Sequence, residues 1–297
     1  MSTTNTSEGH ATGGPFLGMP PATAGIALGL LAPLLWSSSG MFVKILTLEP
    51  LAITAVRALI AGVVLAPWLR LRGLRVNGAL ILLLIGYTAS ICCYVVAVKL
   101  TTAANAIALI STAPAWVLVF SWVAARRILW GMAWPVLLIL AGVAAMLAEP
   151  HVGRSLEGNL IALGGGLGFG LFTFFLPRVN IRGPGMVSLT NLVAGVAVLA
   201  TGLVALDPAK VATWEWAALL YLGLVQIGLA TLCFAAAMQR IPAMQASILA
   251  LLEPLLAPIW VYLAIGESPS AYGAVGFACI LTGIVADFLI RRRQLTG

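Results

Sequence analysis

Two polar side chains stand near the middle of long apolar runs, where an uncompensated charge or amide is costly. Glu253 lies in the run 243–264 and Gln226 in the run 214–238. A carboxylate at that depth indicates contact with a cationic group or transfer of a proton, or else a neutral Glu that braces the chain break at Pro254. An amide there indicates a bond to Glu253 or to a bound carboxylate, although a bond that joins neighbouring helices is favoured.

A second group combines aromatic rings with hydroxyls at a similar predicted depth. For any single aromatic residue, a place in the core or against lipid is favoured. As a group, rings that need partners for their hydroxyls indicate a pocket for amphipathic molecules. Its candidate lining residues are Trp36, Ser37, Ser38, Tyr87, Tyr94, Ser111, Trp116 and Phe169.

Two basic residues lie close to one predicted end of the helices, and we interpret them as structural or gating charges. For Lys44, snorkelling towards water or pairing with Glu49 is favoured. Arg57 lies deeper, where a guanidinium either holds helix-end carbonyls together or meets a carboxylate. Further along, Glu267 with Ser268 and Pro269 predicts the start of a helix.

Composition places all these residues in a membrane protein. Of 297 residues, 61% are hydrophobic and 8% are charged, against about 45–50% and about 25% in soluble domains. The net charge of +7 comes from basic residues scattered between apolar runs, which does not indicate a nucleic-acid partner. His10 and His151 lie outside those runs, so neither a metal site nor a cofactor is expected, and no catalytic group is predicted.

The chain has room for about ten membrane-spanning helices and little else. We therefore predict an all-α integral membrane protein with breaks at Pro33, Pro114, Pro254 and Pro258. The predicted spans are 22–43, 51–69, 78–98, 104–123, 130–148, 159–176, 186–206, 214–238, 243–264 and 271–290.

The basic residues sort between the two predicted membrane faces. Eleven Lys and Arg fall on one face and five on the other. Since cytoplasmic loops carry the excess of Lys and Arg, both termini are predicted to be cytoplasmic, in the inner membrane. Residues 1–21, rich in Ser, Thr, Gly and Pro, are predicted to be a disordered cytoplasmic tail.

Self-comparison predicts an internal repeat. At an offset of 133 the run 59–63 aligns with 192–196, and at an offset of 140 residues 97–114 align with 237–254. This divides the membrane domain into 22–150 and 151–297, with five helices each. An odd number of helices places the second copy in the opposite sense, and inverted repeats around a central cavity are typical of secondary transporters.

Short motifs along the chain resemble the EamA-type drug/metabolite transporter superfamily. They are the first-helix run 35–44, the segment 50–61 around Arg57, the stretch 94–114, and the pair Gly266-Glu267 followed by Gly276 and Gly283. Arg126-Arg127 replaces the corresponding Gly-Glu of the first half. The resemblance implies a ten-helix carrier that exports or exchanges small organic solutes, and it is greatest to the YddG-type exporters of aromatic and other amino acids.

Other functions are less compatible with this sequence. A membrane enzyme would need clustered ligands or a nucleophile and base, and a channel would need charged rings or a filter sequence. The glycine cluster 164–170 lacks the strand and the Lys-Ser/Thr of a phosphate loop, which excludes an ATP-driven pump, and instead predicts close helix packing. The prediction is a secondary carrier for amino acids or, alternatively, for other amphipathic metabolites or drugs. Coupling to protons and oligomeric state stay open.

Overall fold

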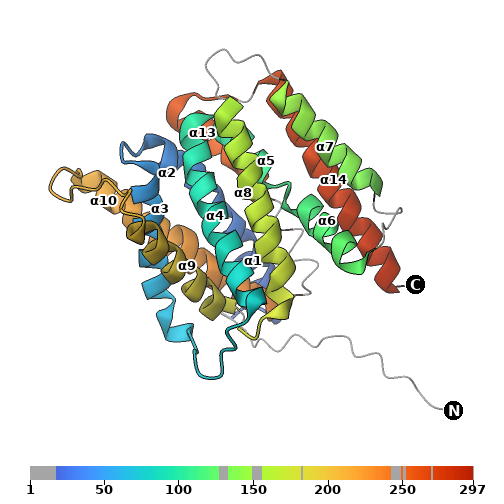
Figure 1. Cartoon of the computed structure of the whole chain (residues 1–297), viewed down its shortest axis with the longest axis horizontal. Coiled ribbons are helices and arrows are strands. Elements are labelled where there is room, and N and C mark those ends of the chain that lie inside the picture. Colours follow the sequence, from blue (N-terminus) through green and yellow to red (C-terminus); the bar gives the residue numbers. More distant parts are fainter. Residues whose placement is uncertain are drawn as a thin grey trace.

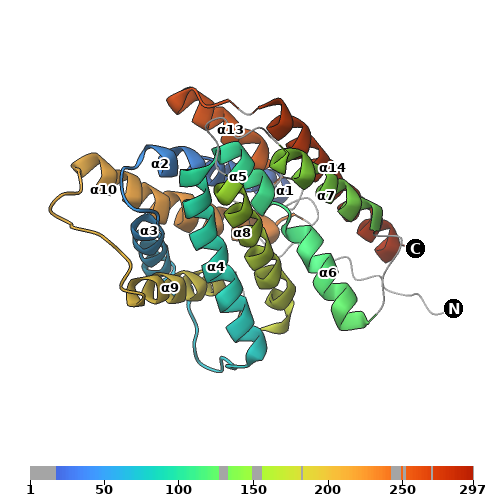
Figure 2. The same ribbon diagram turned by 45° about the horizontal axis from the view of Figure 1, so that its top comes forward.

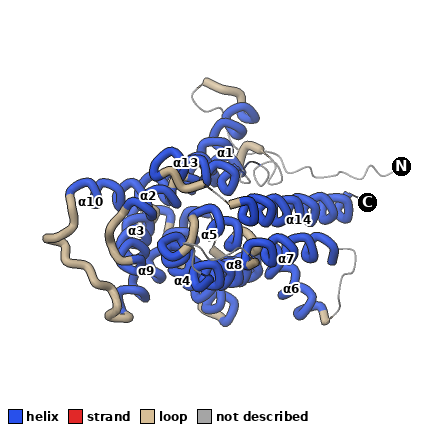
Figure 3. The backbone as a smooth tube through the Cα atoms, turned by 90° about the horizontal axis from the view of Figure 1, so that it is seen from above, coloured by secondary structure: helices blue, strands red, loops and turns tan. Residues whose placement is uncertain are grey.

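The computed structural model describes residues 18–126, 133–148, 156–181, 183–241, 249, 252–268 and 270–296, and its regular elements are all helical. Most of the predicted tail therefore lies outside the described residues. Figure 1 shows a bundle of long helices, and Figures 2 and 3 show it tilted and from above. The elements of the first half are α1 Pro21–Ser37, α2 Ser39–Ile45, α3 Pro50–Val64, η1 Ala66–Trp68, α4 Gly78–Leu100, α5 Ala103–Ile110, α6 Ala113–Ala125 and α7 Ala133–Leu147.

The second half has a corresponding series of helices. Its elements are α8 Leu156–Phe175, η3 Leu176–Arg178, α9 Gly183–Ala200, α10 Thr213–Leu220, η4 Tyr221–Leu229, α11 Ala230–Met238, α13 Leu252–Ile265 and α14 Ala271–Thr296. Within the described residues, six helical segments are long and apolar enough to cross a membrane, and four shorter apolar helices accompany them. The number of ten spans stays a prediction.

The first predicted span is broken at a different residue from the one expected. Pro33 lies inside the continuous helix α1, and the break comes at Ser38, between α1 and α2. There the hydroxyls of Ser37 and Ser38 donate to the carbonyls of Leu34 and Leu35, at 2.8 and 2.7 Å. Such local bonds compete with the helical pattern of the backbone. Two adjacent serines, rather than the proline, thus coincide with the interruption.

The other three prolines at which breaks are predicted also differ in their positions within the helices. Pro258 lies inside the continuous helix α13, so the break predicted there is wrong. Pro114 lies in the first turn of α6, and Pro254 lies near the beginning of the described part of α13. A proline in the first turn sacrifices no helical hydrogen bond, because the first N–H groups of a helix have no partner inside it.

Helices of the two halves contact one another in exchanged pairs. α1 packs against α11 and α13, while α8, which occupies the same place in the second half, packs against α4 and α6. α3 packs against its own counterpart α9, and α7 against α14 (Figures 1 and 3). Two copies related by a two-fold axis would make these pairs. The largest buried apolar cluster likewise contains residues of both halves.

Glycines allow α4 and α8 to approach closely. A Cβ atom on Gly86 would lie 2.7 Å from the carbonyl oxygen of Gly168, and a Cβ on Gly168 would lie 2.7 Å from that of Gly86. Also on α8, a Cβ on Gly166 would lie 2.6 Å from Thr112 Oγ1. No side chain fits between these backbones, so the glycine cluster makes the close helix contact that the sequence predicts.

We expect Gly86→Ala to lower the thermal stability of the purified protein, because the new methyl group must push α8 away. Overpacking of this kind costs about 1–3 kcal/mol. Gly164→Ala is the matched control, since a Cβ there meets nothing within 4 Å. Thermal unfolding in detergent measures both variants, and equal melting temperatures would contradict the expected contact.

Candidate functional site

The break between α1 and α2 lies against η4, a π-helical segment of the second half. The hydroxyls of Ser38 and Tyr221 share a hydrogen bond of 3.0 Å, and the rings of Phe42 and Tyr221 lie 4.6 Å apart. Gln226 Nε2 donates to the carbonyl oxygen of Trp36 over a long 3.5 Å. π-Helical turns are frequent at functional sites. Two irregular segments, one from each half, therefore meet here.

Aromatic residues of α11 and α13 flank this junction. Trp260 Nε1 donates to Ser37 Oγ at 2.8 Å, and the ring centroids of Trp36 and Phe234 lie 5.2 Å apart. The side chain of Ser37 is buried. The predicted residues Trp36, Ser37 and Ser38 thus share one neighbourhood.

Arg57 lies next to this junction, in the middle of α3. It is only 4% exposed, and its Nη1 donates to Ser39 Oγ at 3.3 Å. Its guanidinium carbon lies 5.4 Å from the ring centroid of Tyr94, within cation–π range. Its Nε has no hydrogen-bond partner among the described residues. The sequence-based alternative in which Arg57 holds helix-end carbonyls finds no support in these contacts.

Tyr87 extends the cluster towards α9. Asn191 Nδ2 donates to the Tyr87 hydroxyl at 2.7 Å and to the carbonyl of Val187 at 2.8 Å. The rings of Tyr87 and Phe172 lie 5.3 Å apart, and the Tyr87 hydroxyl lies within electrostatic range of Arg57. Asn191 Oδ1 is buried without a partner in the described part of the chain.

Three buried polar atoms of this cluster are therefore unpaired within the described ranges. Arg57 Nε is a charged donor, and Asn191 Oδ1 and Gln226 Oε1 are acceptors. Buried polar groups are nearly always hydrogen-bonded, and each exception requires an explanation. A donor that carries positive charge suits a carboxylate, whereas amide oxygens suit an ammonium group.

Glu253 lies in the first turn of α13 and is partly buried. Its carboxylate lies within electrostatic range of the hydroxyl of Tyr94, the residue that also contacts Arg57. Among the described residues, which do not include 250 and 251, Glu253 makes no ion pair or hydrogen bond. The predicted alternative of a bond between Gln226 and Glu253 is therefore absent, because Gln226 turns its amide nitrogen towards Trp36.

Three of the predicted lining residues make other contacts. Ser111 donates to the carbonyl of Ile107 at 2.8 Å where α5 ends. Trp116 packs so tightly on α8 that a Cβ on Gly170 would lie 2.5 Å from the Trp116 Cβ. Phe169 is 41% exposed, and its ring lies 5.6 Å from that of Phe172.

Other members of the cluster were not among the predicted site residues. They are Ser39, Asn191, Tyr221 and Trp260. Asn191 is the one that the sequence could have revealed, because it lies inside the predicted apolar span 186–206 and the cost of polar groups at depth applies to it. The others are ordinary residues for a membrane helix, and only the packing selects them.

A charged network joins the helix ends near the labels α2 and α13 in Figure 1. Lys44 Nζ lies 3.0 Å from Glu267 Oε2 and donates to the carbonyl of Thr101 at 2.7 Å. Glu267 Oε1 accepts from the backbone N–H of Ala103 at 2.7 Å. The pairing of Lys44 with Glu49 is therefore wrong, since the fold brings Glu267 of the other half to Lys44.

The helix start predicted from Glu267, Ser268 and Pro269 lies close to the observed one, since α14 begins at Ala271. The Glu267 carboxylate is used by Ala103 and Lys44. At the start of α14, Ser270 Oγ accepts from the backbone N–H of Gly273 at 2.9 Å. Glu267 therefore joins neighbouring helices, whereas Ser270 caps the start of α14.

A second set of contacts strengthens this end of the bundle. Glu215 Oε1 accepts from both the backbone N–H and the hydroxyl of Thr47, each at 2.8 Å, and Glu215 Oε2 accepts from Ala212 N at 3.2 Å. Lys99 Nζ donates to the carbonyl of Leu46 and interacts electrostatically with Glu215. Both carboxylates, Glu215 and Glu267, belong to the second half and contact the first half. The network therefore fastens the two halves together at this end.

Comparison with known families decides the classification. The model of the EamA-like transporter family matches residues 23–148 and again 156–287. The chain belongs to this family of membrane transporters. The family model thus matches twice, once in each half of the chain. The protein is accordingly a multi-pass membrane transporter for small solutes.

A solved crystal structure has the same overall fold. It matches with a TM-score of 0.57 at 21% sequence identity, over 92% of this chain and 99% of the other. At that identity the similarity concerns the fold alone. No curated protein matches the chain significantly.

We expect Lys44→Glu to lower the melting temperature and Lys44→Glu/Glu267→Lys to recover part of the loss. The single variant places two carboxylates together, whereas the double variant restores opposite charges but loses the Ala103 bond. The two side chains are only 16% and 19% exposed. Their coupling free energy should therefore exceed the value of about 1 kcal/mol that is typical of exposed ion pairs.

The control for this pair is Lys210→Glu. Lys210 pairs with Asp207 at 3.2 Å, but the two side chains are 84% and 51% exposed. Little change is expected from it. Equal losses in the Lys210 and Lys44 variants, or no recovery in the double variant, would refute the role of the network.

Proposed function

We propose that this transporter moves small zwitterionic solutes, best represented by amino acids including aromatic ones, by alternating access. The observation that carries the proposal is the set of unpaired buried atoms at the junction of the two halves: Arg57 Nε, Asn191 Oδ1 and Gln226 Oε1. These groups are costly to bury unless a bound molecule completes their hydrogen bonds. A zwitterion brings both complements at once.

The two charges of an amino acid find suitable partners in this cluster. A guanidinium binds a carboxylate through charge-assisted hydrogen bonds, which are about twice as strong as neutral ones. The carboxylate of Glu253 and the amide oxygens accept from an ammonium group. The rings of Trp36, Tyr87 and Tyr94 supply apolar contacts for the side chain of the solute. This chemistry supports amino acids over other metabolites or drugs, which stay the alternative.

Alternating access draws its support from the arrangement of the two halves. The exchanged helix contacts are those of a two-fold repeat, and the irregular segments at Ser38 and in η4 resemble the discontinuous helices that transporters use at their binding sites. The Lys44–Glu267 network closes one end of the bundle and must separate for that end to open. We place the protein in the cytoplasmic membrane with both termini inside, on the strength of the distribution of Lys and Arg.

Counterflow tests the substrate. The purified chain is placed in liposomes loaded with unlabelled amino acid, and labelled Phe, Met or Thr is added outside. We expect labelled amino acid to accumulate, and Arg57→Gln to reduce the rate roughly tenfold or more, since a hydrogen bond to a charged group contributes about 1.5–3 kcal/mol. Lys210→Gln, which removes an exposed charge far from the cluster, is the control. Absence of counterflow across a broad amino-acid panel would refute the amino-acid proposal.

A separate substitution tests the role of the carboxylate. We expect Glu253→Gln to impair transport or to remove its dependence on pH, because the amide neither carries a proton nor attracts an ammonium group. Glu157→Gln, an exposed carboxylate in the first turn of α8, is the matched control. Flux measured between acidic and basic pH in both variants decides the question. Unchanged flux at every pH in Glu253→Gln would exclude both proposed roles.

A further inference from the structure

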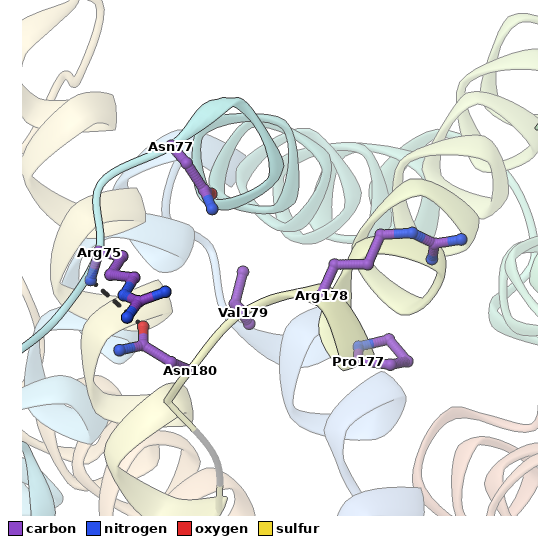
Figure 4. Close-up of a pocket in the computed structure, with 6 residues that line it drawn as sticks. All are labelled: Arg75, Asn77, Pro177, Arg178, Val179 and Asn180. Carbon is purple, nitrogen blue, oxygen red and sulfur yellow. Dashed lines mark hydrogen bonds between the residues drawn. The ribbon is translucent and has the colours of Figure 1, made fainter.

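A cleft opens at the other end of the bundle, away from the charged network. It has a volume of about 320 Å³ and lies between the segment before α4 and the segment that follows α8. Figure 4 shows Arg75 on one side of it and Arg178 on the other. Its lining residues are Arg75, Asn77, Pro177, Arg178, Val179 and Asn180.

Hydrogen bonds hold the walls of this cleft in place. Asn180 Nδ2 donates to the carbonyl of Gly73 at 2.7 Å, and Asn180 Oδ1 accepts from the backbone N–H of Arg75 at 3.3 Å. Asn77 caps α4 by accepting from the backbone N–H of Leu80 at 3.0 Å. Asn180 thus connects two segments that are far apart in the sequence, and Asn77 fixes the start of α4, so both shape the cleft before any ligand binds.

The charge around the cleft is entirely basic. The segments 65–78 and 176–185 contain five arginines and no Asp or Glu. The guanidinium of Arg178 lies over the ring of Phe174, 3.8 Å from its centroid, and donates to the carbonyl of the same residue. Neither Arg75 nor Arg178 is paired with a carboxylate among the described residues. The cleft therefore suits an anion.

Exposed apolar side chains surround these arginines. Trp68, Leu71 and Val76 are 47%, 55% and 76% exposed. On α4, Ile81 and Ile85 follow about one and two turns after Asn77, and they are 50% and 55% exposed. Trp beside Arg at the end of apolar helices is typical of the boundary between membrane and water. A soluble anion would use the arginines but leave the apolar residues without contacts.

We propose that this cleft binds the phosphate headgroup of an anionic phospholipid. Arg75 contacts the phosphate, since forked guanidinium groups bind phosphate oxygens well. Arg178, whose guanidinium lies over the ring of Phe174, adds positive charge at the opposite wall. The apolar side chains beside the cleft contact the lipid chains. The proposal does not depend on the identity of the transported solute, because the cleft lies outside the cluster around Arg57.

Native mass spectrometry of the purified full chain tests the proposal. The probes are phosphatidylglycerol, phosphatidylcholine with the same acyl chains, and inorganic phosphate. We expect phosphatidylglycerol to bind, and binding to weaken roughly fivefold in Arg75→Gln and roughly tenfold or more in Arg75→Gln/Arg178→Gln, in line with about 1 kcal/mol per basic residue at a membrane surface. The control is Lys210→Gln, in which affinity should not change.

Each other outcome overturns the proposal. Equal binding of phosphatidylcholine would show that binding does not depend on the charge of the headgroup. Binding of inorganic phosphate as tight as that of phosphatidylglycerol would show a site for soluble anions. Arg75→Gln leaves the stacked Arg178 in place, so it tests the charge without disturbing the end of α8, and unaltered lipid affinity in that variant would also refute the site.

Discussion

The close contact of helix backbones through glycine is the interaction on which the rest of the structure depends. Lipid chains are as apolar as the side chains of a membrane helix, so burial of apolar surface does not drive helices together inside a bilayer. Dense packing and hydrogen bonds must do so. Gly86 and Gly168 let α4 and α8 touch without intervening side chains. Gly62 and Gly195 have the same effect between α3 and α9, where an added Cβ would meet Leu192 and Leu59.

These close contacts determine where the polar side chains meet. Arg57 and Asn191 belong to α3 and α9, and Tyr87 follows Gly86 directly on α4. Once the helices approach, Asn191 reaches the Tyr87 hydroxyl, and Arg57 lies near Tyr94 and Ser39. Water is scarce at this depth, so polar groups must find partners inside the protein or in a bound solute. The cluster concentrates that requirement at one place, between the two halves.

The two ends of the bundle differ in whether their basic side chains are paired with carboxylates. At the end with Lys44, acidic residues of the second half neutralise basic residues of the first, and each carboxylate also accepts backbone hydrogen bonds. At the end with Arg75 and Arg178, arginines line an open cleft without acidic neighbours in the segments around it. The first arrangement holds helices together, whereas the second leaves positive charge available to the membrane surface.

Much of this protein could be predicted from its residue types alone. Composition determined the membrane class and the helical fold, because a chain with 8% charged residues cannot be a soluble domain and its backbone needs internal hydrogen bonds in lipid. Short motifs also sufficed to indicate the family, and the cost of polar groups at depth singled out Glu253 and Gln226.

The tertiary structure decided which of the candidates come together. Lys44 is paired with Glu267, more than two hundred residues away, rather than with its neighbour Glu49, and the first helix breaks at Ser38 rather than at Pro33. Phe169 and Trp116 are predicted together from their depth, but Phe169 is 41% exposed whereas Trp116 packs against Gly170 of α8. The physical reason is that hydropathy specifies how deep a residue lies and not the direction in which it faces, which depends on the rotation of each helix against its neighbours.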